Sequence, residues 1–232
     1  MLRAEKLNQF YGESNILRDL TLEAKKGRNT CLMGRNGVGK TTFLGCVMGL
    51  VPVRTGKIFY KGRDITGLAP EARARMGMGY VPQGRQIFPL LTVEENLKLG
   101  LPYGRSGKKR EIPTHVYDFF PVLREMLKRR GGDLSGGQQQ QLAIARALAT
   151  DPEFLILDEP TEGIQPNIVR EIVLATRRFA AELDMTVLQV EQKVPVAKTA
   201  GDDYAIMERG SVAAKGEMKD LGAETIKNFL SV

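Results

Sequence analysis

Residues 34–41, Gly-Arg-Asn-Gly-Val-Gly-Lys-Thr, decide the fold. The segment fits the spacing G-x-x-x-x-G-K-[ST] with Gly34 and Gly39 as its glycines, and an apolar run at 30–33 precedes it. In such a loop successive backbone N–H groups turn toward phosphates, and glycine allows positive φ angles and close approach. Lys40 is then expected to reach the β- and γ-phosphates, and the Thr41 hydroxyl to hold Mg²⁺. This motif alone fits a kinase, a GTPase or a motor.

Two later motifs narrow the choice. Residues 134–138, Leu-Ser-Gly-Gly-Gln, form a small-residue turn that opens a helix, and a helix N-terminus is a second candidate phosphate site. The apolar run at 154–157 predicts a buried parallel strand. Asp158 and Glu159 follow it directly, so both carboxylates are expected at the carboxyl end of that strand.

The three motifs in this order resemble the signature of ABC-type ATPases, and the resemblance covers essentially all 232 residues. It implies one ABC ATPase domain over 1–232 with an α/β fold. A P-loop ATPase core with an N-terminal antiparallel β portion would form one lobe, from about 1–84 and 151–232. An inserted α-helical subdomain would occupy about 85–150.

Residue patterns fit this order of elements. Residues 2–27 alternate apolar and polar side chains around a turn at 11–14, which predicts antiparallel strands. A segment at 101–113, rich in Gly, Pro and Lys, is expected to be a mobile loop. Helices are predicted at 42–50, 93–99, 115–128, 137–150, 168–183 and near 223–230, and further strands at 56–65 and 186–190, with a hairpin at 205–212 that turns at Arg209-Gly210.

The resemblance also assigns roles to single residues. Glu159 would be the general base for the attacking water, and Asp158 would bind Mg²⁺. Gln83 would contact Mg²⁺ and the water, and Tyr11 would stack on adenine. The cofactor set is ATP and Mg²⁺. The nucleotide-binding residues implied in this way are Tyr11, Gly34, Arg35, Asn36, Gly37, Val38, Gly39, Lys40, Thr41, Thr42, Ser135 and Gly137; the metal-binding residues are Thr41, Gln83 and Asp158.

One position departs from the family pattern. Most members carry a histidine after the last buried strand, but here residues 190–192 are Val-Glu-Gln, and the only histidine, His115, lies in the helical segment. Gln192 can donate an amide N–H to the γ-phosphate, but it cannot carry a proton or a charge. Gln192 is therefore expected to keep the contact without any acid–base role.

Ser135 and Gly137 are expected to act on a neighbouring protein. In the family architecture they face the ATP of an opposing subunit, which implies a head-to-tail dimer with a second ABC ATPase or with a second copy. Two transmembrane permease subunits and, indirectly, an external solute-binding protein complete the implied assembly. The groove for the membrane subunits is expected near 83–89.

Composition limits the alternatives. The net charge is +7, with basic runs at 105–110 and 124–130 that fit a solvated face or attraction to anionic lipid or an acidic partner. Nucleic acid is not expected as a partner, because these runs contain few aromatic residues that could stack on bases.

The two cysteines, Cys31 and Cys46, lack the spacing of a metal site or of a disulfide framework and are expected to be small buried residues. Without a signal-like or spanning apolar run, the protein is expected in the cytoplasm, peripheral on the inner face of the plasma membrane.

The transported solute is suggested by likeness alone. Residues 80–89, 91–97 and 190–192 are similar to the importer branch for branched-chain amino acids and urea. Residues 32–39 and 162–166 look more like the urea-type second ATPase subunit. The expected function is therefore ATP hydrolysis for a bacterial importer of urea or short-chain amides, with branched-chain amino acids as the alternative. An exporter or lipid-flipping subunit would share every catalytic motif, and a soluble ABC protein acting on ribosomes or DNA is a further alternative.

Overall fold

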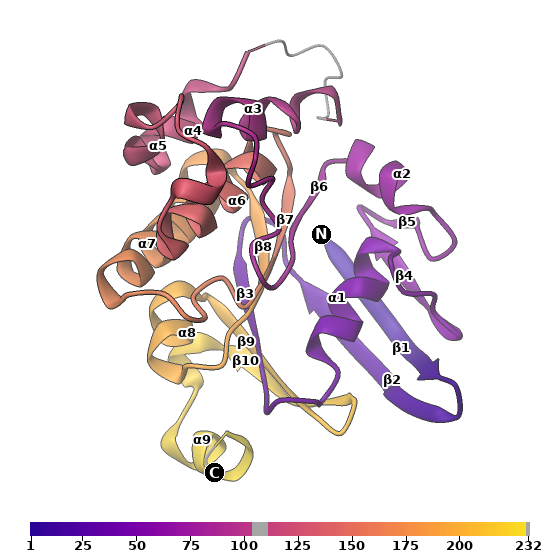
Figure 1. The fold of residues 1–232 in the computed structure, drawn as a ribbon. Helices are drawn as coiled ribbons and strands as arrows, with labels where there is room; N and C mark the ends of the chain where they lie inside the picture. The colour runs from indigo at the N-terminus through magenta and orange to yellow at the C-terminus, as the bar shows by residue number, and fades with distance from the viewer. Residues whose placement is uncertain (104–110, 231–232) are drawn as a thin grey trace.

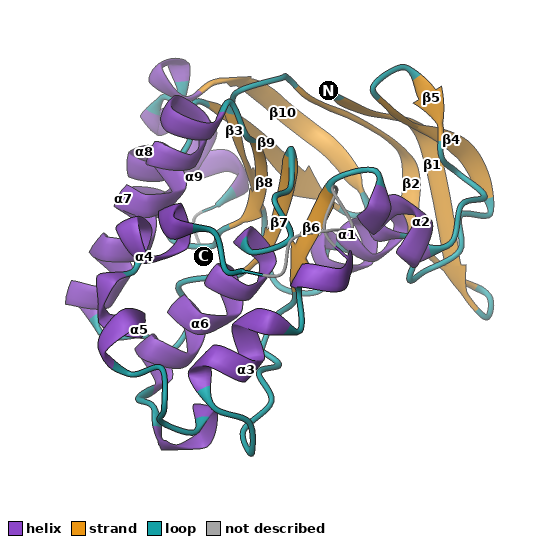
Figure 2. Cartoon of the chain, turned by 90° about the horizontal axis from the view of Figure 1, so that it is seen from above, coloured by secondary structure: helices purple, strands orange, loops and turns teal. Residues whose placement is uncertain are grey.

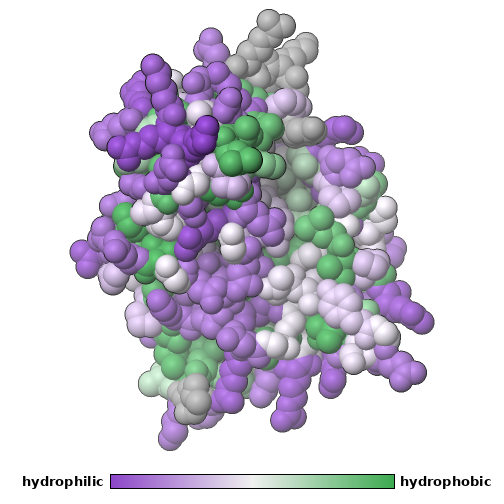
Figure 3. All heavy atoms as spheres, in the orientation of Figure 1, coloured by the Kyte–Doolittle hydropathy of each residue, from purple (hydrophilic) through white to green (hydrophobic). Residues whose placement is uncertain are grey.

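The computed structural model describes residues 1–103 and 111–230 (Figure 1). The basic run at 105–110 lies outside the described residues, as does most of the loop expected at 101–113. Within the described part of the chain, no helix combines the length and hydrophobicity needed to cross a bilayer. The face in Figure 3 is largely hydrophilic, with hydrophobic residues in smaller patches between.

The N-terminal part forms a four-stranded antiparallel sheet in the order β2-β1-β4-β5. A two-residue turn at Gly12-Glu13 joins the first two strands, and Leu20, Leu22 and Ala24 are buried on one side, as the alternating pattern predicts. The strands are β1 (Leu2–Tyr11), β2 (Ser14–Ala24), β4 (Thr55–Tyr60) and β5 (Arg63–Asp64).

A six-stranded sheet in the order β10-β9-β3-β8-β7-β6 forms the centre of the molecule. Its neighbours pair in parallel except for the hairpin of β9 and β10, which turns at Arg209-Gly210 as predicted. Every residue of β3, β7 and β8 is buried. The strands are β3 (Asn29–Met33), β6 (Met78–Val81), β7 (Phe154–Asp158), β8 (Thr186–Val190), β9 (Asp203–Glu208) and β10 (Ser211–Glu217).

Helices pack on the central sheet. Figures 1 and 2 show α3, α4, α5 and α6 grouped on one side of it and the antiparallel sheet on the other. The helices are α1 (Lys40–Met48), α2 (Pro70–Arg75), α3 (Val93–Lys98), α4 (Thr114–Phe119), α5 (Pro121–Glu125), α6 (Gly136–Leu148), α7 (Pro166–Leu183), α8 (Val194–Ala200) and α9 (Ala223–Phe229), with 3-10 turns at Leu101–Tyr103, Gly131–Asp133 and Met218–Asp220.

The two faces of the central sheet have separate cores because side chains alternate along each strand. In β7, Phe154 and Ile156 pack with the antiparallel sheet and α1, whereas Leu155 and Leu157 pack with α6 and α7. The α/β architecture agrees with the expected fold class. The lobe limits near 85 and 150 stay a prediction.

Two local expectations need correction. The single helix predicted over 115–128 is two short helices, α4 and α5, because Pro121 lacks an N–H and restricts the residue before it. Phe120 accordingly has φ −133° and ψ 71°, outside the helical region. The short helices α2 and α8 were not predicted, since six or seven residues give little periodic signal.

Arg73 of α2 fixes the end of helix α1, which begins at Lys40. The Arg73 side chain is 1% exposed and donates to the carbonyls of Cys46 and Val47, each at 2.8 Å. It also donates to two carbonyls of the 65–68 turn, at 2.9 Å each. Because the last carbonyls of a helix lack intrahelical donors, this guanidinium supplies the Val47 carbonyl with a donor, and the Cys46 carbonyl with a second one beside the Gly49 N–H.

We expect Arg73→Met to lower the free energy of unfolding by about 3 kcal/mol, since each buried carbonyl left without a donor costs about 1–3 kcal/mol. Arg75→Met, at an exposed position of the same helix, should change it by less than about 0.5 kcal/mol. Urea unfolding followed by circular dichroism measures both. Equal effects of the two variants would contradict the anchoring role of Arg73.

Candidate active site

The candidate site lies where the carboxyl ends of the parallel strands meet. The glycine-rich loop follows β3, and Gln83 follows β6. Asp158 ends β7 and Glu159 follows it, while Gln192 follows β8. A cavity of about 380 Å³ at this edge is lined by Tyr11, Ile16, Asn36, Gly37, Gly39, Lys40, Thr41, Thr42, Gln83, Glu159, Glu162 and Gln192. The structure thus brings together most of the residues predicted to bind or hydrolyse ATP.

The loop depends on glycine at two crowded positions. Gly34 has φ 148°, and a Cβ there would lie 2.5 Å from the carbonyl oxygen of Met207 in β9. Gly39 has φ 104°, and its Cβ would press on Ile16 and Leu17 of β2 at 3.1–3.3 Å. The loop therefore packs closely against β9 at Gly34 and against β2 at Gly39, where a larger residue would not fit. Gly34, Arg35 and Val38 belong to the loop but do not line the cavity.

Lys40 is the buried cation of the site. Its side chain is the first of helix α1, and its Nζ donates to the carbonyls of Gly34 at 2.8 Å and Arg35 at 2.9 Å. Burial lowers the pKa of Lys40, and the carboxylates of Glu159 and Asp158 oppose that shift. The ammonium thus lies in the curve of the loop, where phosphate oxygens can replace the two carbonyls as acceptors.

Asp158 has the chemistry of a cation ligand. The residue is 1% exposed, and neither carboxylate oxygen accepts a hydrogen bond from any residue that the structure describes. Burial raises the pKa of Asp158, while the nearby Thr41 hydroxyl and Lys40 ammonium favour its charged form. A buried carboxylate without a donor fits a bound cation, and oxygen ligands from Asp158, Thr41 and Gln83 suit Mg²⁺. The described residues contain no group of three or more His, Cys, Asp or Glu side chains placed to hold a metal ion.

A hydrogen-bonded group closes the other side of the cavity. The Nε2 of Gln192 donates to Oε1 of Glu159 at 2.5 Å. The Nε2 of Gln83 donates to Glu159 at 3.2 Å and to Glu162 at 2.8 Å. Burial raises the pKa of Glu159, the Gln192 amide opposes this, and the nearby Glu162 carboxylate adds to the rise. A raised pKa makes the Glu159 carboxylate a stronger proton acceptor than an exposed one, and the two glutamine amides restrain its position.

Tyr11 and the 134–138 segment lie at different places. Tyr11, at the end of β1, is 55% exposed at the rim of the cavity, where a flat ring is accessible. Ser135 and Gly137 are not brought into this cavity. Ser135 caps α6 through a reciprocal pair of bonds with Gln138, and Gly137 packs so closely on Ile168 of α7 that a Cβ would approach it within 2.9 Å.

Sequence reasoning gave no role to three residues of the site. Glu162 and Ile16 line the cavity, and Glu191 is buried beside it. A signal for Glu191 existed, because an acidic residue directly after the buried strand predicted at 186–190 is expected to need specific partners. Ile16 carried no signal beyond the alternation of its strand.

Comparisons with known proteins agree with this geometry. A family model described as "ABC transporter" matches residues 17–162. The probable branched-chain amino acid transport ATP-binding protein LivF of Archaeoglobus fulgidus is 39% identical over 95% of this chain and 94% of its own length. The high-affinity branched-chain amino acid transport ATP-binding protein BraG of Pseudomonas aeruginosa is 36% identical over 98% and 96%. A molybdate/tungstate import ATP-binding protein, WtpC of Thermococcus kodakarensis, is 35% identical over 99% and 70%.

Solved structures give the same result. The crystal structure of a nucleotide-free ATP-binding cassette from an ABC transporter superposes with a TM-score of 0.85 at 28% identity, covering 100% of this chain and 95% of the other. A dimeric ATP-binding cassette in a post-hydrolysis state, bound to ADP and Pi, gives 0.83 at 25% identity, over 94% and 99%. The fold class expected from sequence is confirmed. Because the family match spans well over half of the residues, the chain belongs to the ABC transporter family, and its enzymatic activity is the hydrolysis of ATP.

Proposed function

We propose that this chain is the ATP-hydrolysing subunit of a branched-chain amino acid importer. The observation that carries the proposal is the likeness to LivF and BraG, which extends over nearly the whole length of both partners in each comparison. The relatives' names therefore favour the alternative reading over urea or short-chain amides, which the 32–39 and 162–166 motifs suggest. The molybdate/tungstate relative is of similar identity, so direct measurement of uptake is the decisive test.

In the organism that carries this gene, its deletion should reduce uptake of radiolabelled leucine, isoleucine and valine. The wild-type chain should restore uptake, and the Glu159→Gln chain should not, because transport needs hydrolysis. Radiolabelled urea and molybdate, assayed in the same cells, serve as controls. Loss of urea or molybdate uptake with normal leucine uptake would refute the proposed substrate class.

Binding of ATP is proposed to use groups already arranged in the cavity. The loop N–H groups and the N-terminus of α1 would bind the phosphates, with Lys40 turning from the Gly34 and Arg35 carbonyls to phosphate oxygens. Mg²⁺ held by Thr41, Gln83 and Asp158 would supply positive charge to the β- and γ-phosphates. Stacking of adenine on the exposed ring of Tyr11 would add about 0.5–1.5 kcal/mol.

Hydrolysis is proposed to rest on Glu159. A water oxygen forms a bond to the γ-phosphorus, the bond from that phosphorus to the bridging oxygen of ADP breaks, and the water proton passes to the Glu159 carboxylate. Gln192 donates to Oε1 of that carboxylate and Gln83 to Oε2, and each oxygen keeps a further lone pair that can accept the water proton. Because burial raises the pKa of Glu159, activity should be full above that pKa and decline as the pH falls through it.

We expect Glu159→Gln to lower kcat at saturating ATP by about 100-fold or more, the usual contribution of a general base. Affinity for a non-hydrolysable ATP analogue, measured by calorimetry, should stay within about threefold, since the amide keeps the shape of the carboxylate. Glu162→Gln is the matched comparison in the same cavity and should cost much less. A larger loss from Glu162→Gln would move the base role to that residue.

The active assembly is proposed to be a head-to-tail pair of cassettes. Ser135 and Gly137 lie outside the cavity of their own chain, at the N-terminus of the thirteen-residue helix α6. A helix start of this kind favours the phosphates of a second nucleotide, held by a facing subunit. The ADP- and Pi-bound relative is itself dimeric, which supports this arrangement.

With MgATP, the Glu159→Gln chain should shift from monomer to dimer in multi-angle light scattering. Adding Ser135→Asp should abolish the shift, because the new carboxylate would face the partner's γ-phosphate. Adding Ser135→Asn should leave more dimer, since asparagine caps a helix equally well without the charge. If the Asp and Asn variants dimerise alike, Ser135 does not face a phosphate.

The proposed contact with the membrane subunits is a second groove, which shares no lining residue with the nucleotide cavity. It has a volume of about 470 Å³ and lies between β6 and the helices α3 and α6, with Tyr80, Phe88, Leu99 and Arg146 among its lining residues. Phe88 is half exposed, as expected of a surface that a partner covers. This groove adjoins residues 83–89, so a helix of a permease subunit seated there would place the chain on the inner face of the plasma membrane, with an external solute-binding protein acting indirectly.

A further inference from the structure

Glu191 is a buried carboxylate to which the catalytic proposal gives no role. It follows β8 in the middle of the central sheet and is 4% exposed. The Thr161 hydroxyl donates to its Oε2 at 2.6 Å. The backbone N–H groups of Gln192 and Lys193 both donate to its Oε1, at 2.9 Å each. The backbone N–H of Glu191 in turn donates to Leu32 of β3 at 3.2 Å.

Together with the Gln192–Glu159 bond, these hydrogen bonds form a closed ring that includes Glu159, the proposed general base. From Glu159 the chain passes through Pro160 to Thr161, and Thr161 donates to Glu191. Glu191 binds the backbone of the next two residues, and the Gln192 side chain returns to Glu159 at 2.5 Å. The loop after β7 and the loop after β8 are thus joined twice, once through Glu191 and once through Gln192. Side chains on a loop keep a fixed geometry when such bonds restrain their backbone.

We propose that Glu191 is a positioning residue that fixes the backbone of residues 192–193, so that the Gln192 amide meets the Glu159 carboxylate. A carboxylate is costly to bury, and among the described residues this one accepts hydrogen bonds only from the two loops that carry Glu159 and Gln192. A neutral apolar residue would fill the same space without binding either loop. This proposal rests on the roles proposed above for Glu159 and Gln192.

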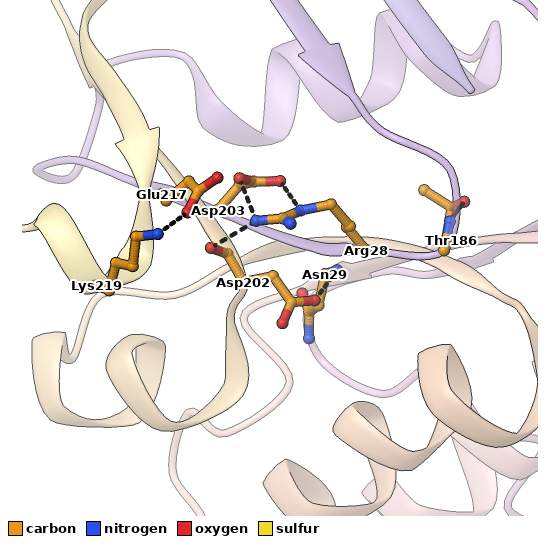
Figure 4. Close-up of polar contacts among 8 residues, drawn as sticks. Arg28, Asn29, Thr186, Asp202, Asp203, Glu217 and Lys219 are labelled. Atoms are coloured by element: carbon orange, nitrogen blue, oxygen red, sulfur yellow. Dashed lines mark hydrogen bonds and ion pairs between the residues drawn. The ribbon is translucent and has the colours of Figure 1, made fainter.

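The chain offers a matched control for the loss of a buried carboxylate. Asp203 is 8% exposed and begins β9, at the amino end of the parallel strands, opposite the cavity. Its two oxygens accept from the Arg28 guanidinium at 2.7 and 2.8 Å, as Figure 4 shows. Asp203→Asn also removes the charge of a buried carboxylate, though one paired with a cation, and it does so at the end of the sheet away from the cavity. It therefore reports on stability without touching the site.

The first experiment needs neither nucleotide nor metal. In the full chain labelled with ¹⁵N in glutamine side chains, the Gln192 amide resonance is assigned by its loss in Gln192→Ala. Glu191→Ala should move that resonance toward the position of a solvent-exposed glutamine, Glu191→Gln should move it part of the way, and Asp203→Asn should leave it in place. An unchanged resonance in a folded Glu191→Ala chain would overturn the proposal.

The second experiment measures hydrolysis of ATP by the full chain. Glu191→Ala should lower kcat by about 10- to 100-fold, as expected of misplaced catalytic groups, with KM for ATP within about threefold. Asp203→Asn should leave both constants near the wild-type values. If Glu191 acts through Gln192, the Glu191→Ala/Gln192→Ala double variant should be no slower than the slower single variant. Multiplying losses would overturn the proposal.

Two further outcomes keep the proposals separate. If Gln192→Ala hydrolyses ATP at the wild-type rate, the proposed catalytic role of Gln192 is wrong. A shifted Gln192 resonance in Glu191→Ala would still support the proposal that Glu191 positions the Gln192 side chain. Should Glu191→Ala not fold, Thr161→Val replaces it, because valine removes the hydroxyl donor at nearly constant volume. Thr161→Val should then lower kcat by a smaller factor than expected for Glu191→Ala. An unchanged kcat together with an unchanged Gln192 resonance would overturn the proposal that this ring of hydrogen bonds positions Gln192.

Discussion

Parallel pairing of β3, β8, β7 and β6 is the constraint on which the site depends. Four strands that run the same way end at one edge, so loops far apart in sequence meet there. Both faces of these strands are covered by separate apolar cores, which leaves no room for chemistry along the strands themselves. On these strands the candidate functional groups therefore lie at the last residue or just beyond it, as Asp158, Glu159 and Gln192 do.

The sequence predicted those parts of the site whose structure is determined by residues adjacent in the chain. The glycine spacing at 34–41 and the acidic pair after an apolar run each require only neighbouring residues, and the hairpin at Arg209-Gly210 follows from turn chemistry. Glu191 and Thr161 are 30 positions apart, and their bond exists only because β7 and β8 are adjacent. Arg73 shows the same limit. From sequence alone, a charged residue in a six-residue helix is expected to be exposed, and only the fold reveals the carbonyl groups that it binds when buried.

The solute could not be predicted for a different physical reason. In the roles proposed above, Glu159, Lys40 and the loop act on ATP, and their chemistry would be the same whatever the membrane subunits carry. Of the segments that resemble the importer branch, 80–89 contributes Tyr80 and Phe88 to the groove proposed for a permease. The urea expectation rested on 32–39 and 162–166, which belong to the glycine-rich loop and to the loop after β7, so their likeness does not report on the solute. Whole-chain identity favours branched-chain amino acids instead.

The two carbonyl bonds of Lys40 make the loop an occupied site even before nucleotide arrives. The Gly34 and Arg35 carbonyls would compete with phosphate oxygens for this ammonium, and their bonds to it restrain the curvature of the loop. In the binding proposed above, arrival of a triphosphate would be an exchange of acceptors rather than the ordering of a slack segment. The affinity for nucleotide would then reflect the difference between two bound states of Lys40, and release of ADP would leave a loop already shaped for the next round.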